Sequence, residues 1–341
     1  MDHTVADNRS LRADASGDQP LYGALDLGTN NCRLLLATPA GAGLHVVEAF
    51  SKVTRLGEGL AASGTLSTEA IERSLSALRQ CALRLQRRNV LRARAVATEA
   101  CRQAANGALF LERVRREIGL DLETISAEDE AKLALAGCAP LLDRQFPFAL
   151  VFDIGGGSTE LVKVKLGSSS ETDRVETLAS LPLGVVTLAE AEGAKLDTPA
   201  GYARTVEQIV ERLRPFDRDS GLGALTAAGQ VHMLGTSGTV TTLAGVHLNL
   251  PRYDRAVVDG LVMEFSAIEK ISRQLATATA TERAAFPCIG DTRADLVVAG
   301  CAILEAIRRL WPVGRLTVAD RGVREGILLS MMRADQMVGK A

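Results

Sequence analysis

Two segments of the chain each place an aspartate next to a glycine-rich turn. In the first, Asp26 is followed by Leu-Gly-Thr-Asn; in the second, Asp153 is followed by Ile-Gly-Gly-Gly-Ser-Thr-Glu. Each aspartate ends an apolar run, and a second apolar run follows each turn, which is typical of a β-hairpin. A carboxylate beside exposed backbone N–H groups can hold a divalent cation and a phosphate group together.

The turn residues themselves suit phosphate binding. Glycines let the backbone approach a ligand closely, and hydroxyl or amide side chains add hydrogen-bond donors. The candidates are Gly28, Thr29, Asn30, Gly155, Gly156, Gly157, Ser158 and Thr159. Either motif alone could be a plain hairpin turn, whereas two matched copies favour a phosphate or nucleotide site.

Two common nucleotide-binding motifs do not fit these turns. The chain contains no GxxxxGK[ST] sequence, which excludes a P-loop. A strand rather than a helix is expected after each glycine turn, which argues against a Rossmann fingerprint.

A third segment adds a further anion site. Gly235, Thr236, Ser237 and Gly238 lie between an expected strand over residues 231–235 and an expected helix over residues 240–246. Backbone N–H groups at a helix N-terminus attract anions. Alone, this segment is weak evidence for an anion site. Together with the two hairpins, it supports the same predicted phosphate site.

The elements around these motifs predict an α/β fold in two domains. Strands and amphipathic helices alternate along the chain, and the hairpin motif recurs at domain spacing, which suggests duplication. A chain of 341 residues is also too long to fold around one ordinary hydrophobic core. We expect a disordered tail over residues 1–20, domain I over residues 21–137 plus 320–341, and domain II over residues 138–319.

The composition argues against several classes of binding partner and cofactor. A net charge of −2 favours neither nucleic-acid polymers nor membrane surfaces, and no stretch approaches the ~18 apolar residues of a membrane span. The six cysteines are scattered without a CxxC pair, and no histidine lies at metal-ligand spacing from them. We therefore expect reduced core cysteines in a cytoplasmic protein.

Taken in order, the motifs resemble those of the exopolyphosphatase / guanosine pentaphosphate phosphohydrolase (Ppx/GppA) family of the actin-like ATPase superfamily. The segments that carry the resemblance are Asp26 to Leu34, Thr54 to Gly59, Ala97 to Asn106, Ile125 to Ala131 and Asp153 to Leu161, with shorter matches up to Arg324-Glu-Gly326. The resemblance implies two actin-like (ribonuclease H-like) domains with a cleft between them.

The resemblance also implies the chemistry. It points to metal-dependent hydrolysis of the terminal phosphoanhydride of inorganic polyphosphate, with Mg²⁺ or another divalent cation and release of orthophosphate. It assigns the general base to Glu130, where the residues alone favour helix capping. The remaining expectations are phosphate contacts by Arg33, Arg55 and Arg102 and metal or water positioning by Asp26, Asp153 and Glu160.

Alternatives stay open at this stage. A guanosine pentaphosphate 5′-phosphohydrolase, converting pppGpp to ppGpp, presents the same terminal phosphoanhydride to the same motifs. A nucleotide-binding regulator with weak hydrolysis is a third possibility, against which the retained Glu130 argues. A sugar or acid kinase would need an aspartate base in a sugar pocket and an adenine site, and the chain shows a motif for neither. We expect no counterpart of the helical domains of longer family members, and we expect a homodimer only by resemblance.

Overall fold

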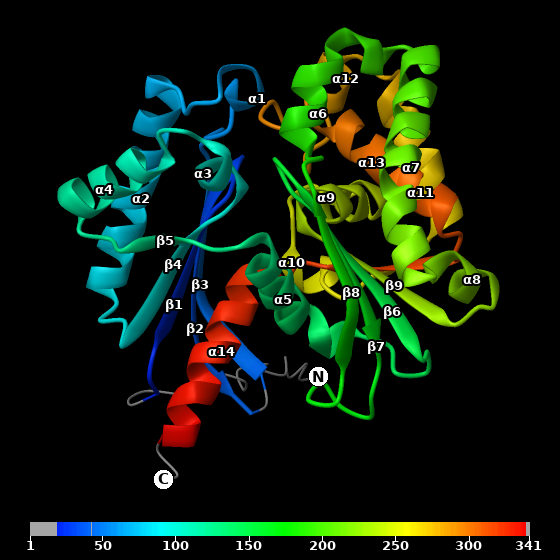
Figure 1. The fold of residues 1–341 in the computed structure, drawn as a ribbon. Coiled ribbons are helices and arrows are strands. Elements are labelled where there is room, and N and C mark those ends of the chain that lie inside the picture. Colours follow the sequence, from blue (N-terminus) through cyan, green and yellow to red (C-terminus); the bar gives the residue numbers. More distant parts are fainter. Residues whose placement is uncertain (1–18, 42, 339–341) are drawn as a thin grey trace, which may run out of the picture.

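The computed structural model describes residues 19–41 and 43–338. The predicted tail lies outside these residues except for its last two positions. Two β-sheets, each covered by helices, lie next to one another (Figure 1). The predicted α/β class and the two repeated sheets are confirmed, whereas the residue boundaries of the domains stay a prediction.

The first sheet has the strand order β3-β2-β1-β4-β5. β1 pairs antiparallel with β2 and parallel with β4, so the hairpin leads directly into a parallel region. The strands are β1 (Tyr22–Leu27), β2 (Asn31–Ala40), β3 (Gly43–Val53), β4 (Arg92–Ala97) and β5 (Leu122–Thr124). The helices of this part are α1 (Leu60–Ser63), α2 (Thr68–Arg87), α3 (Glu99–Gln103), α4 (Gly107–Ile118), α5 (Ala127–Cys138) and α14 (Val323–Val338).

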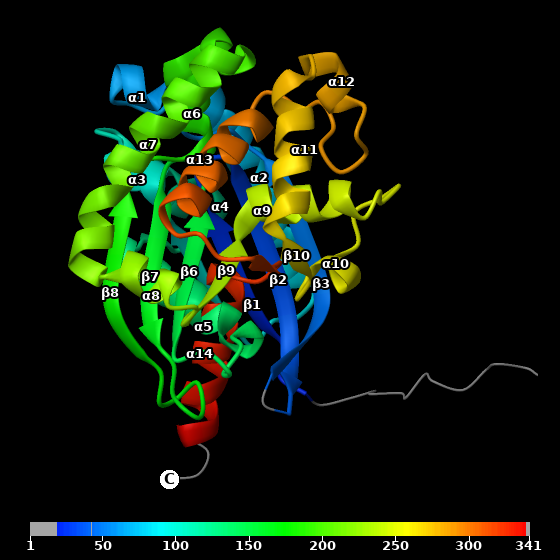
Figure 2. The same cartoon turned by 90° about the vertical axis from the view of Figure 1, so that its right-hand side faces the viewer.

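The second sheet repeats this plan with the order β10-β11-β9-β6-β7-β8. Its strands are β6 (Phe148–Ile154), β7 (Thr159–Lys165), β8 (Arg174–Leu181), β9 (Val231–Thr236), β10 (Val262–Glu264) and β11 (Arg315–Ala319). Its helices are α6 (Val185–Glu192), α7 (Pro199–Ser220), α8 (Leu222–Ala227), α9 (Ser237–His247), α10 (Arg255–Val258), α11 (Phe265–Thr277), α12 (Ala280–Ala284) and α13 (Val297–Leu310), with 3₁₀ turns at Ala139–Leu141 and Gly193–Asp197. α9 packs on β6, β9 and β11, and α11 and α13 stack outside it (Figure 2).

The two hairpins are closed in the same way. In β1–β2 the Gly28 N–H donates to the Asn31 carbonyl at 2.9 Å, and in β6–β7 the Gly155 N–H donates to the Ser158 carbonyl at 2.9 Å. Asp26 lies across from Arg33, and Asp153 lies across from Glu160. The predicted sequence repeat is therefore a structural repeat.

One predicted helix end is wrong. The sequence predicts a helix over residues 198–213. A longer helix would contain Pro215, and proline in a helix interior removes a backbone hydrogen bond. α7 instead continues through Pro215 to Ser220. Phe216 is buried there with its ring 5.7 Å from that of the buried Trp311, so tertiary packing outweighs the local cost.

Helix α5 lies between the two sheets (Figure 1). Leu133 and Ala134 pack into the core of the first sheet, while Ala131 and Cys138 pack against strands of the second. α14 crosses α5 very closely at Gly326. A Cβ on this residue would lie 2.0 Å from the Leu133 carbonyl oxygen, so only glycine fits there. The first turn of α5, which carries Glu130, is thereby held at the junction of the two halves.

None of the helices in the described ranges, 19–41 and 43–338, is long and apolar enough to cross a bilayer.

Candidate active site

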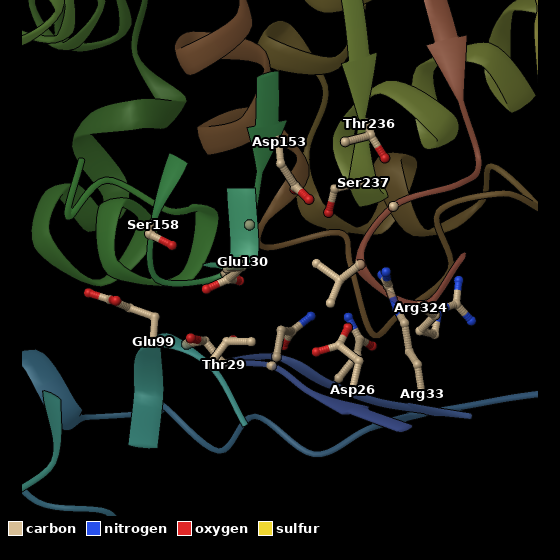
Figure 3. Close-up of a pocket in the computed structure, with 18 of the residues that line it drawn as sticks. Asp26, Thr29, Arg33, Glu99, Glu130, Asp153, Ser158, Thr236, Ser237 and Arg324 are labelled. Carbon is tan, nitrogen blue, oxygen red and sulfur yellow. The ribbon is translucent and has the colours of Figure 1, made fainter. Parts of the chain in front are cut away.

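A polar pocket lies where the two hairpin turns meet (Figure 3). The turns touch: a Cβ on Gly156 would lie 3.0 Å from the Thr29 Cβ and 3.1 Å from the Asn30 nitrogen. Thirteen of the predicted site residues line this pocket. They are Asp26, Gly28, Thr29, Asn30, Arg33, Glu130, Asp153, Gly155, Gly156, Gly157, Ser158, Thr236 and Ser237.

Five predicted phosphate-binding residues do not line this pocket: Thr159, Gly235 and Gly238, and the two arginines Arg55 and Arg102 described below. Thr159 is buried on the opposite face of β7 from Glu160, because side chains alternate along a strand, and its hydroxyl donates to the Leu183 carbonyl at 2.5 Å. Gly235 lies inside β9, where a Cβ would come within 2.5 Å of the Phe152 ring, so this glycine serves packing. Gly238 lines a small adjoining cavity of about 60 Å³.

Glu130 does not cap its own helix. The Ser126 hydroxyl oxygen caps α5 by accepting from the Asp129 N–H at 3.0 Å. The Glu130 carboxylate instead accepts from Arg102 Nη1 at 2.8 Å, and its side chain is 13% exposed. The alternative that the acids of this turn are only capping residues thus fits Asp129 and not Glu130.

Arg102, a predicted phosphate ligand, does not line the pocket. Its guanidinium is held between Glu99 and Glu130, with Nη2 2.6 Å from Glu99 Oε2. Burial raises the pKa of Glu130 well above its ordinary value, and the nearby Glu160 raises it further, while Arg102 acts in the opposite direction. A raised pKa is one property that general-base catalysis requires of a carboxylate.

The three predicted metal carboxylates do not form one cluster. Asp26 and Asp153 line the pocket, whereas Glu160 lies outside its lining, is buried and accepts from the Ser180 hydroxyl at 2.8 Å. Over residues 19–41 and 43–338, no group of three or more His, Cys, Asp or Glu side chains is arranged to hold a metal ion. Burial raises the pKa of Asp153 to about 6, against the charge of Arg33 and a hydrogen bond with Ser237, and burial raises that of Glu160 to about 7.

Part of the pocket comes from residues to which the sequence assigned no site role, the link between β11 and α14 and the first two residues of α14. Asp320, Arg321, Gly322, Val323 and Arg324 all line the pocket. β11 lies parallel to β9, and ligands of α/β sheets bind outside the carboxyl ends of the strands, so the position of this segment could have been inferred. Arg324 and Arg33 both act electrostatically on Asp26.

This geometry agrees with the comparison to known proteins. The family model described as the Ppx/GppA phosphatase family matches residues 36–335. The chain belongs to this family. Membership in the Ppx/GppA phosphatase family confirms the predicted enzyme class, the phosphoanhydride hydrolases.

Individual relatives show how far the likeness extends. The chain is 31% identical over 324 residues to Exopolyphosphatase 2 of Mycobacterium tuberculosis, which covers 90% of this chain and 97% of that protein. It is 29% identical over 320 residues to a guanosine-5′-triphosphate,3′-diphosphate pyrophosphatase of Vibrio parahaemolyticus, of whose length it spans 60%. The crystal structure of the Aquifex aeolicus Ppx/GppA family member superposes with a TM-score of 0.76 at 30% identity, covering 93% of this chain and 99% of that one.

Arg55, a predicted phosphate ligand, lies in a different cavity of about 410 Å³ beside the pocket. It connects the two halves of this Ppx/GppA protein, because its guanidinium donates to the Thr292 carbonyl at 3.3 Å and lies 3.0 Å from Asp295 Oδ2. A second cross-connection runs nearby, from the Gly59 N–H to the Glu190 carboxylate at 2.9 Å. The contacts of Arg55 are those of an interdomain tie.

We therefore expect Arg55→Ala and Asp295→Ala to have similar, modest effects, each lowering kcat/KM by about 2- to 5-fold, because a partly exposed ion pair contributes about 1 kcal/mol or less. The double variant should resemble the single ones, since both remove the same tie. Steady-state kinetics on all three proteins checks this. A loss of three orders of magnitude in R55A, with D295A unaffected, would show instead that Arg55 binds substrate directly.

Proposed function

We propose that this protein hydrolyses the terminal phosphoanhydride of inorganic polyphosphate and releases orthophosphate. One observation carries the proposal: the Glu130 carboxylate opens into a pocket whose walls come from both aspartate–glycine turns. The likeness to Exopolyphosphatase 2 over nearly the full length of that protein supports the choice of substrate.

Substrate binding would rest on three groups of donors. The backbone N–H groups of the two turns suit the terminal phosphate. Thr236 and Ser237 stand at the N-terminus of the 11-residue helix α9, where the helix dipole favours an anion. Arg33 and Arg324 contribute two guanidinium groups that can bind phosphate oxygens bidentately.

The carboxylates fit a divalent cation of the Mg²⁺ type. Mg²⁺ keeps several water ligands and needs only one or two carboxylates plus substrate phosphate oxygens, so Asp26 and Asp153 suffice without Glu160. The raised pKa of Asp153 also fits a cation site. Burial disfavours the ionised carboxylate, and the positive charge of a bound cation would stabilise it. When bound, the cation would neutralise phosphate charge as it develops in the transition state.

Glu130 would act as the general base. Arg102 occupies Oε2 of Glu130, which leaves Oε1 to orient a water molecule and accept its proton. The water attacks the terminal phosphorus in line with the bridging oxygen, the P–O bond to that oxygen breaks, and the shortened chain leaves with the electron pair. Positioning and charge stabilisation supply most of the rate of such a reaction, and a positioned base contributes about 10²- to 10⁴-fold.

Hydrolysis of guanosine pentaphosphate to the tetraphosphate is the second candidate. The cavity of about 410 Å³ that holds Arg55 shares Asn30 with the phosphate pocket and lies in the size range of small-ligand sites, about 300–1,000 Å³. A nucleoside pocket beside Gly238 would also favour this substrate, but the cavity there measures only about 60 Å³. A nucleoside would therefore fit better on the Arg55 side. A binding regulator with weak hydrolysis gains no support from any of these contacts.

The test is phosphate release measured in parallel from long-chain polyphosphate, guanosine pentaphosphate and ATP, with and without Mg²⁺. We expect kcat/KM to be highest for polyphosphate and to depend on the cation. A preference for guanosine pentaphosphate would select the second candidate. Release from none of the three would overturn the proposed activity.

A further inference from the structure

Glu99 is a buried carboxylate at the pocket wall to which neither the sequence motifs nor the proposed reaction gives a role. It is the first residue of the short helix α3, it follows Thr98 directly after β4, and it is 9% exposed. It lines the same pocket as Glu130. A buried charge of this kind is costly unless it is paired and hydrogen-bonded.

Both carboxylate oxygens of Glu99 are used by its own helix. Oε2 accepts from Arg102 Nε at 3.0 Å and from Arg102 Nη2 at 2.6 Å. Oε1 accepts from Gln103 Nε2 at 2.9 Å. Two bonds to one guanidinium fix the plane of that group, so Glu99 sets the orientation of Arg102.

The opposite edge of the same guanidinium reaches the base. Arg102 Nη1 donates to Glu130 Oε2 at 2.8 Å and to the Ile125 carbonyl at 2.9 Å. Glu99, Arg102 and Glu130 thus form a continuous hydrogen-bonded chain with carboxylates at both ends. Only one of those two carboxylates is needed to accept a proton.

The aliphatic part of Glu99 faces the other half of the molecule. A Cβ on Gly157 would lie 3.0 Å from Glu99 Cγ and 3.4 Å from its Cβ. Glu99 therefore packs directly on the second phosphate turn, while its carboxylate holds Arg102. The same residue touches the turn that would bind phosphate and the arginine that holds the base.

We propose that Glu99 is a positioning residue that fixes Arg102 on Glu130 and thereby aligns the base with the second phosphate turn. This inference rests on the proposed function, because the alignment matters for the attack of water on phosphorus. A displacement of about 1 Å in such a constellation can cost about 10²-fold in rate. Glu99 acts through Arg102 and does not itself contact the reacting atoms.

The test is a double-variant cycle on the full-length protein with polyphosphate and Mg²⁺. We expect Glu99→Ala to lower kcat about 100-fold with KM within about 3-fold, because binding groups stay in place. Glu99→Gln should recover activity to within about 10-fold of the wild type, since its amide oxygen can accept from Arg102. In the Arg102→Ala background, Glu99→Ala should lower kcat by less than about a further 2-fold, because its partner is gone.

Glu123→Ala, which removes an exposed carboxylate paired with Arg94, is the matched control and should stay within about 2-fold of the wild type.

A crystal structure of the Glu99→Ala protein decides the question without an activity assay. We expect the Arg102 guanidinium to leave Glu130. Retention of the Arg102–Glu130 contact in that variant, or losses that multiply in the double variant, would overturn the inference and assign Glu99 a direct contact with substrate or cation. Inactivity of the wild type on every phosphoanhydride would overturn the proposed function instead, and the position of Arg102 would still decide the role of Glu99.

Discussion

Replacing Glu130 with glutamine should lower kcat by about 10³- to 10⁴-fold while leaving KM within a few fold. General-base catalysis contributes about 10²- to 10⁴-fold, and a glutamine in this place can still accept from Arg102 but cannot take a proton from water. The fold should persist, because Ser126 and not Glu130 caps α5. Steady-state phosphate release measures the loss, and the far-UV circular dichroism and melting temperature check the fold.

The matched control for Glu130 stands on the same helix turn. The Glu128 side chain is 65% exposed and pairs with Lys132 at 2.6 Å, away from Arg102. Glu128→Gln removes the same charge two residues earlier and should retain wild-type kcat within about 2-fold. Equal losses in both variants would point to the overall charge of the helix start, and near-normal turnover in E130Q would remove Glu130 from the mechanism.

Replacing Asp153 with asparagine should lower kcat/KM by about 10²-fold or more and should remove the response of stability to Mg²⁺. The carboxylate lines the pocket between the two turns, and loss of a cation ligand sacrifices several kcal/mol of charge stabilisation. Titrations of phosphate release against Mg²⁺ measure the first effect. Asp121→Asn, an exposed aspartate before β5, is the control and should behave as the wild type.

The stability of the Asp153→Asn protein relative to the wild type should depend on pH. Burial raises the pKa of Asp153 from 3.8 to about 6 in the folded protein, so the ionised form disfavours folding. The stability that the protonated carboxyl provides is fully present below pH 3.8 and is lost as the pH rises through about 6. Without divalent cations, D153N should therefore melt above the wild type at pH 7.5, and the difference should vanish near pH 4.

Mg²⁺ should remove this difference in melting temperature at pH 7.5. It should raise the melting temperature of the wild type and not that of D153N, because binding to the folded state stabilises it. Thermal melts at several pH values, with and without Mg²⁺, check both statements. A wild type that is insensitive to Mg²⁺ in these melts, together with unchanged activity in D153N, would contradict the assignment of Asp153 as a cation ligand.

Local patterns in the sequence were enough to predict the two hairpins and most of the pocket. Asp26 and Asp153 stand at strand ends before glycine turns, and such turns have few alternative structures. The pairing of Glu99 with Arg102 three residues later on a helix is equally local.

The contacts that the sequence could not supply join segments far apart in the chain. Arg102 meets Glu130 only because α5 lies between the two sheets, and this placement depends on the close crossing with α14 near the end of the chain. Arg55 was expected at a phosphate and instead meets Asp295, 240 residues later. For Arg102 with Glu130 and for Arg55 with Asp295, the partner is brought close by the fold, and the spacing along the chain does not predict it.

The most direct test of the central claim is a reaction run in H₂¹⁸O with polyphosphate and Mg²⁺. If water activated by Glu130 attacks the terminal phosphorus, the orthophosphate released will carry one ¹⁸O and the shortened chain none, and the E130Q protein will release labelled orthophosphate far more slowly. Label in the shortened chain, or no release of orthophosphate by the wild type, would contradict the account.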